Sequence, residues 1–448
     1  MRLHLLGLIV CLFTWKATWS LDQIDKRTVI LVSFDGFRWD YLFRGYSPAL
    51  ERIAASGVRV KQLKNCFPTK TFPNHYSLVT GLYPESHGIV ANFMYDPRLK
   101  KHFTIGNTDP VWWNEAEPAW VTLRRRGYVT ATVNWPGSDV EIRGVRPNHH
   151  NPFNSSIPFR DRVDKAISLL QLTEKERPSF IALYFEEPDF TGHTYGPNGE
   201  ETMQAVKRVD DIAEYLMKRL HEIGMSNNVD VIFTSDHGMA ETSDTREIFL
   251  SDYVRNSSYE LVDYSPLVAL LPHEGMEMEL YRRLRHAHPN MTAYLKQDMP
   301  ERLHYQQSRR IQPLMLLADP GWSIFAKRAA ADHDRGAHGY DNDFPGVRPY
   351  FIATGPAFRR GFKMPLMSNL DIYPLVFHIL GEEPPASNGT LERASRLLKR
   401  PAAAPAGNAV QLPASAGVDA SSRQRMAAVL LSLGGIALLA GTMLLTTL

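Results

Sequence analysis

Short apolar runs alternate with amphipathic stretches from about Val29 to Leu380. Three of the apolar runs, residues 29–35, 181–189 and 229–236, each lead into an aspartate. Such runs are typical of strands buried on both faces of a parallel sheet. Between them the spacing becomes helical, as in residues 206–223, where six core positions recur every three or four residues: Val206, Val209, Ile212, Leu216, Leu220 and Ile223. The pattern predicts an α/β fold, a mostly parallel central sheet flanked by helices.

The two ends of the chain differ in composition from the stretch between them. Residues 1–20 combine a basic start, an apolar run and small residues, which predicts a secretory signal peptide. Residues 386–425 are rich in Pro, Ala, Ser and Gly and predict a flexible stalk. Residues 426–448 are apolar and long enough to span a bilayer. Residues 21–385 are left as one catalytic domain.

The terminal apolar run has two interpretations, a single-pass span or the signal for a GPI anchor. The arginines lie before the run, against the positive-inside tendency, and small residues with a polar spacer precede it. The GPI signal is therefore favoured. Either anchor predicts a protein held at its C-terminus on the extracellular face of the plasma membrane.

Charge and cysteine content narrow the class of protein further. A formal net charge of +2 offers no basic stripe, so no nucleic acid polymer is expected as a partner. Of the two cysteines, Cys11 leaves with the signal peptide, so Cys66 is expected to be a buried, inert thiol rather than an intermolecular link. Four asparagines head glycosylation sequons, consistent with secretion: Asn154, Asn256, Asn290 and Asn388.

Carboxylates and imidazoles follow the predicted strands. Ligands of open α/β sheets bind at the carboxyl ends of strands, so residues distant in sequence can converge there. Oxygen and imidazole ligands without thiolates suit catalytic zinc, and two zinc ions can clamp both oxygens of a displacement at phosphorus. The candidate two-zinc site comprises Asp35, Thr71, Asp189, His193, Asp236, His237 and His338.

Local spacing supports several of these residues. Adjacent Asp236 and His237 at a strand end form the strongest signal, because a buried pair of this kind needs a partner such as a metal. Asp189 and His193, four residues apart, can meet one metal from a helical turn or a tight loop, and the neighbouring proline and glycine favour the loop. Glycines beside His338 allow close approach to a crowded site.

Two further polar residues have both a structural and a functional interpretation. Thr71 lies near the start of a helix whose first turn accommodates Pro73, so it is either a capping residue or a metal-activated nucleophile. The N–H groups there would also favour a phosphate anion. Asn92 is either a turn residue or an amide donor to charge developing on a phosphate oxygen.

Other candidates are set aside. Asp332, His333 and Asp334 are expected to be solvated in a polar loop, and His75 and His87 to be structural. Residues 66–70 approximate the C-x-P-x-R segment of sulfatases, but Lys70 replaces the arginine and the histidine-rich ligand set suits zinc better than calcium.

The segments LVSFDGFRWDYL, TKTFPNHYSLVTGLYPESHGIVAN, EEPDFTGHTYGP, TSDHGM and HGYDN resemble the ectonucleotide pyrophosphatase/phosphodiesterase family. Shorter segments are most similar to its members 4 and 5, with member 4 somewhat nearer through WWNEA. The resemblance implies an alkaline-phosphatase-like fold with two Zn²⁺ ions. Asp189, His193 and His338 would hold one ion, and the second would be held by Asp35, Thr71, Asp236 and His237.

The same resemblance implies a reaction. Thr71 would be the nucleophile, Asn92 would bind the oxyanion, and Phe72 and Phe153 would sandwich the base of a nucleotide substrate. The expected activity is hydrolysis of diadenosine triphosphate, and less well of ATP, to a nucleoside monophosphate. Two alternatives are a choline-phospholipid phosphodiesterase and a catalytically silent surface receptor.

Overall fold

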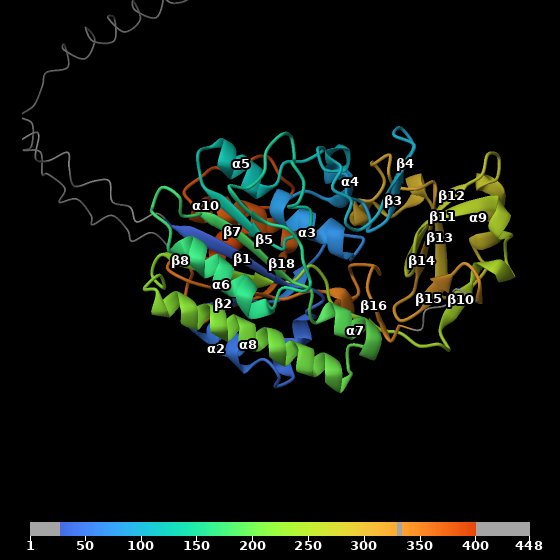
Figure 1. Ribbon diagram of the computed structural model, residues 1–448. Coiled ribbons are helices and arrows are strands. Elements are labelled where there is room, and N and C mark those ends of the chain that lie inside the picture. Colours follow the sequence, from blue (N-terminus) through green and yellow to red (C-terminus); the bar gives the residue numbers. More distant parts are fainter. Residues whose placement is uncertain (1–26, 329–333, 400–448) are drawn as a thin grey trace, which may run out of the picture. The chain divides into compact units, whose positions relative to one another are not determined.

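The computed structural model describes residues 27–328 and 334–399, built around an eight-stranded sheet (Figure 1). The strand order is β18-β2-β17-β8-β1-β7-β5-β6. The bounds are β1 (Thr28–Phe34), β2 (Val58–Lys64), β5 (Thr130–Val133), β6 (His149–Asn151), β7 (Phe180–Phe185), β8 (Val229–Thr234), β17 (Phe351–Thr354) and β18 (Phe362–Ser368). Among the described residues β17 alone runs antiparallel to its neighbours in this sheet. The prediction of a mostly parallel sheet is confirmed.

Helices cover both faces of this sheet (Figure 1). On one face lie α2 (Pro48–Ser56), α6 (Phe159–Leu170) and α8 (Glu200–Glu222); on the other lie α3 (Thr71–Thr80), α5 (Ala119–Arg125) and α10 (Ile372–Ile379). Successive side chains of a strand point to opposite faces. Accordingly Val29 and Leu31 of β1 pack with α3 and α5, whereas Ile30 and Val32 pack with α2, α6 and α8. Both faces of β1 are therefore apolar, as its sequence predicts.

The long helix α8 confirms the helical spacing of residues 206–223. Five of the six predicted core positions are buried, and Ile223, just beyond the helix end, is half-buried against the same core. In α3 the helix ends at Thr80 because Gly81 adopts φ 67° and donates its N–H to the carbonyl of Ser77.

A second, antiparallel sheet was not predicted. It has the order β11-β12-β14-β13 and lies apart from the central sheet, beside α9 (Figure 1). Its elements are β11 (Tyr259–Asp263), β12 (Leu267–Pro272), α9 (Glu277–Leu284), β13 (Met291–Leu295) and β14 (Leu314–Ala318). The sequence pattern predicts further βα units in this region, and that prediction is wrong here. The small sheet has its own apolar core, which includes Leu270, Leu284 and Leu316.

Shorter elements connect the two sheets and the flanking loops. The paired strands are β3 (Met94–Asp96) with β4 (Lys101–Phe103), β9 (Ala240–Glu241) with β16 (Gly336–Ala337), and β10 (Glu247–Phe249) with β15 (Ser323–Phe325). The short helices are α4 (Pro84–His87), α7 (Asp189–Tyr195) and α11 (Leu391–Ala394).

The packed domain continues to Lys399. Ala394 and Leu397 are fully buried in the core beneath α3 and α10, within the first part of the segment predicted to be a stalk. The predicted signal peptide, the remainder of the stalk and the anchor lie outside the described residues. Within residues 27–328 and 334–399, no helix is long and apolar enough to cross a membrane.

Cys66 is buried, as expected, and burial raises the pKa of its thiol to about 12, in agreement with an inert thiol. Of the sequon asparagines, Asn154, Asn256 and Asn388 are exposed. Asn290 is half-buried and donates from Nδ2 to the carboxylate of Asp319, 3.2 Å away. Glycosylation of all four stays a prediction.

Candidate metal centre

Three neighbouring parallel strands, β8, β1 and β7, bring the candidate carboxylates to one edge of the sheet. Ser33 of β1 is level with Thr234 of β8 and Tyr184 of β7, so the residues that follow all three strands leave the sheet together. The backbone N–H of Asp189 donates to the carbonyl of Asp35 at 3.0 Å. This bond holds the start of α7 against the end of β1.

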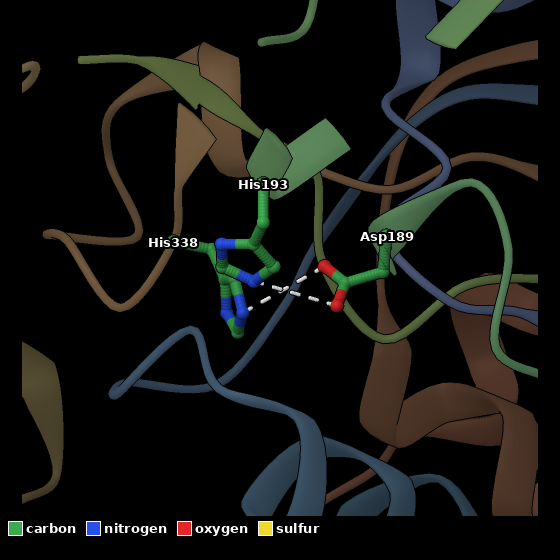
Figure 2. A group of neighbouring side chains, drawn as sticks. All are labelled: Asp189, His193 and His338. Carbon is green, nitrogen blue, oxygen red and sulfur yellow. Dashed lines mark ion pairs between the residues drawn. The ribbon is translucent and has the colours of Figure 1, made fainter. Parts of the chain in front are cut away.

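One group of candidate ligands consists of Asp189, His193 and His338. Their ligand atoms all lie within 4.8 Å of one another. Figure 2 shows both imidazole rings facing the carboxylate, with His193 Nε2 3.4 Å from Asp189 Oδ2 and His338 Nε2 3.7 Å from Asp189 Oδ1. Two side chains of α7 and one from a distant part of the chain thus surround one small volume.

The loop expected around Asp189 and His193 is instead a helix, α7. Pro188 precedes the helix as its N-cap, where a missing backbone N–H costs nothing. Gly192 lies inside the helix, and a Cβ at this position would lie 3.1 Å from the side chain of Met239. The glycine therefore permits close packing rather than a chain reversal.

The second group surrounds His237. Its Nε2 lies 3.0 Å from Asp236 Oδ2, 3.3 Å from Asp35 Oδ1 and 3.3 Å from the Thr71 hydroxyl. The rings of His237 and His338 stack with centroids 3.5 Å apart, so the two groups adjoin. All seven candidate residues are thus assembled at the sheet edge, although their roles stay predictions.

Backbone carbonyls orient the three histidines. The Nδ1 atoms of His193, His237 and His338 lie 2.8 to 2.9 Å from the carbonyls of Gly336, Gly238 and Thr69, respectively. A carbonyl only accepts, so each Nδ1 must bear the proton and donate. In its neutral form each ring then has its Nε2 lone pair facing the carboxylates, which is the arrangement of metal-binding histidines.

Three buried carboxylate oxygens indicate whether a cation fits between the two groups of candidate ligands. Asp35 Oδ1, Asp189 Oδ1 and Asp236 Oδ2 have no hydrogen-bond partner among the described residues. The other oxygens of Asp35 and Asp236 accept hydrogen bonds, from the Tyr184 hydroxyl at 2.6 Å and from the Ser235 hydroxyl at 3.1 Å. Unpaired buried charge is costly, and oxygen and imidazole donors without thiolate suit divalent zinc. The donor set fits such an ion.

The charges of these carboxyl groups are strongly coupled. Burial, together with neighbouring Asp236 and Asp189, raises the pKa of Asp35 well above its ordinary value. Burial opposes ionisation of Asp236 as well, but the facing rings of His237 and His75 lower its pKa. Burial and the nearby His237 lower the pKa of His338 to about 3, so its imidazole is neutral. A neutral imidazole is the form that binds metals.

Thr71 is the first residue of α3 and borders a cavity of about 410 Å³. We call this the Phe72 cavity, because Phe72, Phe153 and Trp113 line it, together with Asp189. Phe153 is 48% exposed, so its ring lies at the surface. The two aromatic residues expected to hold a base therefore line one cavity beside Thr71.

Asn92 has a fixed orientation. Its Oδ1 accepts from the backbone N–H of Phe72 at 3.0 Å, next to Thr71. The side-chain amide is thus left to donate from Nδ2. This geometry fits the oxyanion role expected for Asn92, which stays a prediction.

Several supporting residues were missed or assigned differently. Tyr184 donates its hydroxyl to Asp35 Oδ2 at 2.6 Å; the only sequence signal was a hydroxyl within an otherwise apolar strand. His75 holds the Thr71 carbonyl at 2.9 Å through Nδ1, in agreement with a structural role. Asp334 lies 3.5 Å from His193 Nδ1, so it contacts the site although it is half exposed. Asp332 and His333 lie outside the described residues.

The fold, with carboxylates and histidines gathered at one edge of the sheet, defines a hydrolase of the alkaline-phosphatase-like α/β class. The family model for type I phosphodiesterase / nucleotide pyrophosphatase matches residues 29–341. The chain belongs to this family and is a hydrolase of phosphoric diesters and pyrophosphates. Metal dependence is general in the family, and the groups around Asp189 and His237 are candidate sites for the ions.

Named relatives are similar over most of their length. Human ectonucleotide pyrophosphatase/phosphodiesterase family member 5 is 43% identical over 88% of this chain and 82% of its own. Human bis(5′-adenosyl)-triphosphatase ENPP4 is 45% identical over 83% of this chain and 82% of its own. A solved structure of murine member 5, an inactive threonine-to-alanine variant in complex with AMP, has a TM-score of 0.81 at 42% identity and covers 83% of this chain and 100% of that one. The expected resemblance to members 4 and 5 is confirmed.

Proposed function

We propose that this protein is a two-zinc nucleotide pyrophosphatase/phosphodiesterase. It hydrolyses diadenosine triphosphate and ATP-like nucleotides to a nucleoside monophosphate through a nucleotidyl-threonine intermediate. The observation on which this rests is the set of three buried carboxylate oxygens without partners, facing three imidazole Nε2 atoms beside Thr71.

In this proposal Asp189, His193 and His338 hold one zinc ion; Asp35, Thr71, Asp236 and His237 hold the other. Two such ions lower the pKa of a bound hydroxyl and of water, and balance charge on phosphate oxygens. The carbonyl bonds at each Nδ1 keep the imidazoles in the required tautomer.

The residues of the chain perform two displacements at one phosphorus. The Thr71 oxygen loses its proton and attacks, and the bond from phosphorus to the leaving phosphate breaks, releasing ADP from diadenosine triphosphate. Water then attacks the same phosphorus, the bond to Thr71 breaks, the threonine oxygen regains a proton, and AMP is released. The Asn92 amide donates to the phosphate oxygen, and the N-terminus of α3 favours the anion.

The Phe72 cavity supports a nucleotide as the substrate. Phe72 and Phe153 present aromatic faces to it, and stacking on such faces is favourable for any nucleobase. AMP is bound in the solved structure of murine member 5, and human ENPP4 is a bis(5′-adenosyl)-triphosphatase by name. The same murine protein is inactive with one threonine changed to alanine, which supports a threonine nucleophile here.

We further propose that the enzyme acts at the cell surface. The proposal combines a signal peptide over residues 1–20, a catalytic domain over residues 21–385, a stalk over 386–425 and an anchor signal over 426–448. The names of the relatives describe ectoenzymes, in keeping with an extracellular site of action. Glycans on Asn154, Asn256, Asn290 and Asn388 belong to the same proposal.

Product analysis tests the activity. The purified protein with zinc is incubated with diadenosine triphosphate, ATP and glycerophosphocholine, beside a Thr71→Ala variant whose folding is checked by circular dichroism. We expect AMP and ADP from the dinucleotide, and a loss of turnover of more than about a thousandfold in the variant. Release of a choline product alone would instead indicate the phospholipid phosphodiesterase, and no turnover with metal bound would indicate a silent receptor.

A further inference from the structure

A second cavity, of about 420 Å³, borders the candidate metal centre at residues other than those that line the Phe72 cavity. We call it the Tyr264 cavity. His193, His338 and Asn92 line one part of it, and none of its lining residues is shared with the Phe72 cavity. Asp189, which lines the Phe72 cavity, lies 3.4 Å and 3.7 Å from the two histidines. A substrate that crosses the metal centre can therefore enter both cavities.

The small antiparallel sheet and strand β15 together supply one wall of the Tyr264 cavity. Leu261 and Val268 from β11 and β12, and Ile324 from β15, make this wall apolar. Two aromatic rings, Phe93 and Tyr264, meet edge to face with centroids 5.2 Å apart, and Tyr264 is 53% exposed. A flat aromatic ligand can stack on such surfaces.

The charge in this cavity does not favour a polyphosphate. Lys70 is the only lysine or arginine among the described residues that line it. Its Nζ lies 2.5 Å from Asp263 Oδ2 and 3.0 Å from the carbonyl of Tyr264, so its charge is already neutralised. A free pyrophosphate would find no unpaired cationic side chain among these residues.

Neutral hydroxyls and aromatic rings remain for recognition. Ser265 accepts the backbone N–H of Ile324 at 2.9 Å, which leaves its own hydroxyl proton available to donate. Ser323 also lines the cavity. The combination of ring surfaces, hydroxyls and a neutralised lysine matches a nucleoside, with its phosphates remaining at the histidine end.

We propose that the Tyr264 cavity binds the nucleoside of the leaving group. This proposal rests on the proposed function and deepens it. The nucleotide transferred to Thr71 occupies the Phe72 cavity, the bridging phosphates pass His193 and His338, and the second base stacks on Tyr264. Substrates with a nucleoside at both ends are therefore preferred to nucleoside triphosphates, whose leaving group is pyrophosphate.

The test compares diadenosine triphosphate with ATP, which share the transferred AMP and differ in the leaving group. The wild type is expected to have the higher kcat/KM for the dinucleotide. In a Tyr264→Ala variant the ratio of the two kcat/KM values falls by roughly tenfold, mainly through KM for the dinucleotide, because stacking of one base is lost. The matched Tyr264→Phe variant retains the ring and the wild-type ratio.

An unchanged ratio in Tyr264→Ala would overturn this inference and leave the proposed hydrolase activity intact. Equal losses with both substrates would also overturn it, because they would indicate a general structural role. If the wild type hydrolyses neither nucleotide, the proposed function fails and the leaving-group site fails with it.

Discussion

The strand β8 has a buried carboxyl group near each of its ends, and the two groups behave in opposite ways. Asp230, near the amino end, accepts the backbone N–H of Ala357 at 2.8 Å, and its other oxygen has no hydrogen-bond partner among the described residues. Burial raises the pKa of Asp230 to about 6. Asp236, just beyond the carboxyl end, is equally inaccessible, yet the imidazoles of His237 and His75 lower its pKa.

Burial alone therefore does not identify a functional carboxylate. At the amino end, burial favours the protonated form and is a cost to stability at neutral pH. At the carboxyl end, the imidazoles keep Asp236 ionised beside two further carboxylates, so the group can bind a cation. The neighbouring side chains, rather than the depth of burial, therefore distinguish the structural carboxyl group of Asp230 from the candidate metal ligand Asp236.

The largest expected contrast is in activity. Asp236→Asn removes a proposed ligand charge and is expected to lower kcat/KM by more than about a hundredfold, since changes outside the ligand shell already cost 10- to 100-fold. Asp230→Asn, the same substitution on the same strand, is expected to retain activity within about twofold, because it is remote from the ligands. Steady-state hydrolysis of diadenosine triphosphate measures both. Equal losses in the two variants would contradict the contrast between the ends.

Removing the metal should lower the stability of the protein, and only a substitution at the carboxyl end of β8 should change the size of that effect. Ions in hundredfold excess over Kd stabilise a protein by about 2.7 kcal/mol, so a chelator should lower Tm and added zinc should restore it. Thermal unfolding of the wild type and both variants is the measurement. The shift should be the same in Asp230→Asn as in the wild type and smaller in Asp236→Asn. A Tm insensitive to chelator in the wild type would argue against bound metal.

The smallest effect is a pH dependence at the amino end. The pKa of Asp230 is about 6 in the folded state and about 3.9 when unfolded, so its stabilising contribution is complete below pH 4 and is lost as the pH rises through 6. Asp230→Asn cannot ionise, so it should gain about 2 kcal/mol relative to the wild type between pH 4 and pH 7.5. Denaturant unfolding at both pH values checks this. A difference that is constant with pH would refute the raised pKa.

The sequence was most informative where chemistry follows strands. Aspartates at the ends of β1 and β8 could be expected to meet because parallel strands share an edge, and their assembly needs no precise loop geometry. Phe72 and Phe153 could be proposed for one cavity only through resemblance to a known family. Their loops have no periodicity from which such proximity follows.

The features that could not be predicted from the sequence depend on tertiary contacts. The small sheet escaped notice because short apolar runs such as β12 and β14 fit parallel and antiparallel strands alike. The sequence favours a loop at Asp189, where the structure has a helix, because the packing of Gly192 against Met239 cannot be inferred from local sequence. Likewise, the pairing of Lys70 with Asp263 joins the start of α3 to β11 of the small sheet across nearly two hundred residues and has no local signal.

Thr69 connects the segment around His338 to the start of α3. Its carbonyl receives the Nδ1 proton of His338 and its hydroxyl bonds Gly339 and Tyr340, only two residues before Thr71. In the proposed mechanism, the attacking Thr71 oxygen and the proposed zinc ligand His338 are thus linked through these hydrogen bonds, so a displacement at the start of α3 would move both. A structural change in the small sheet should therefore slow both the formation and the hydrolysis of the proposed intermediate. The nucleotidyl-threonine should then not accumulate.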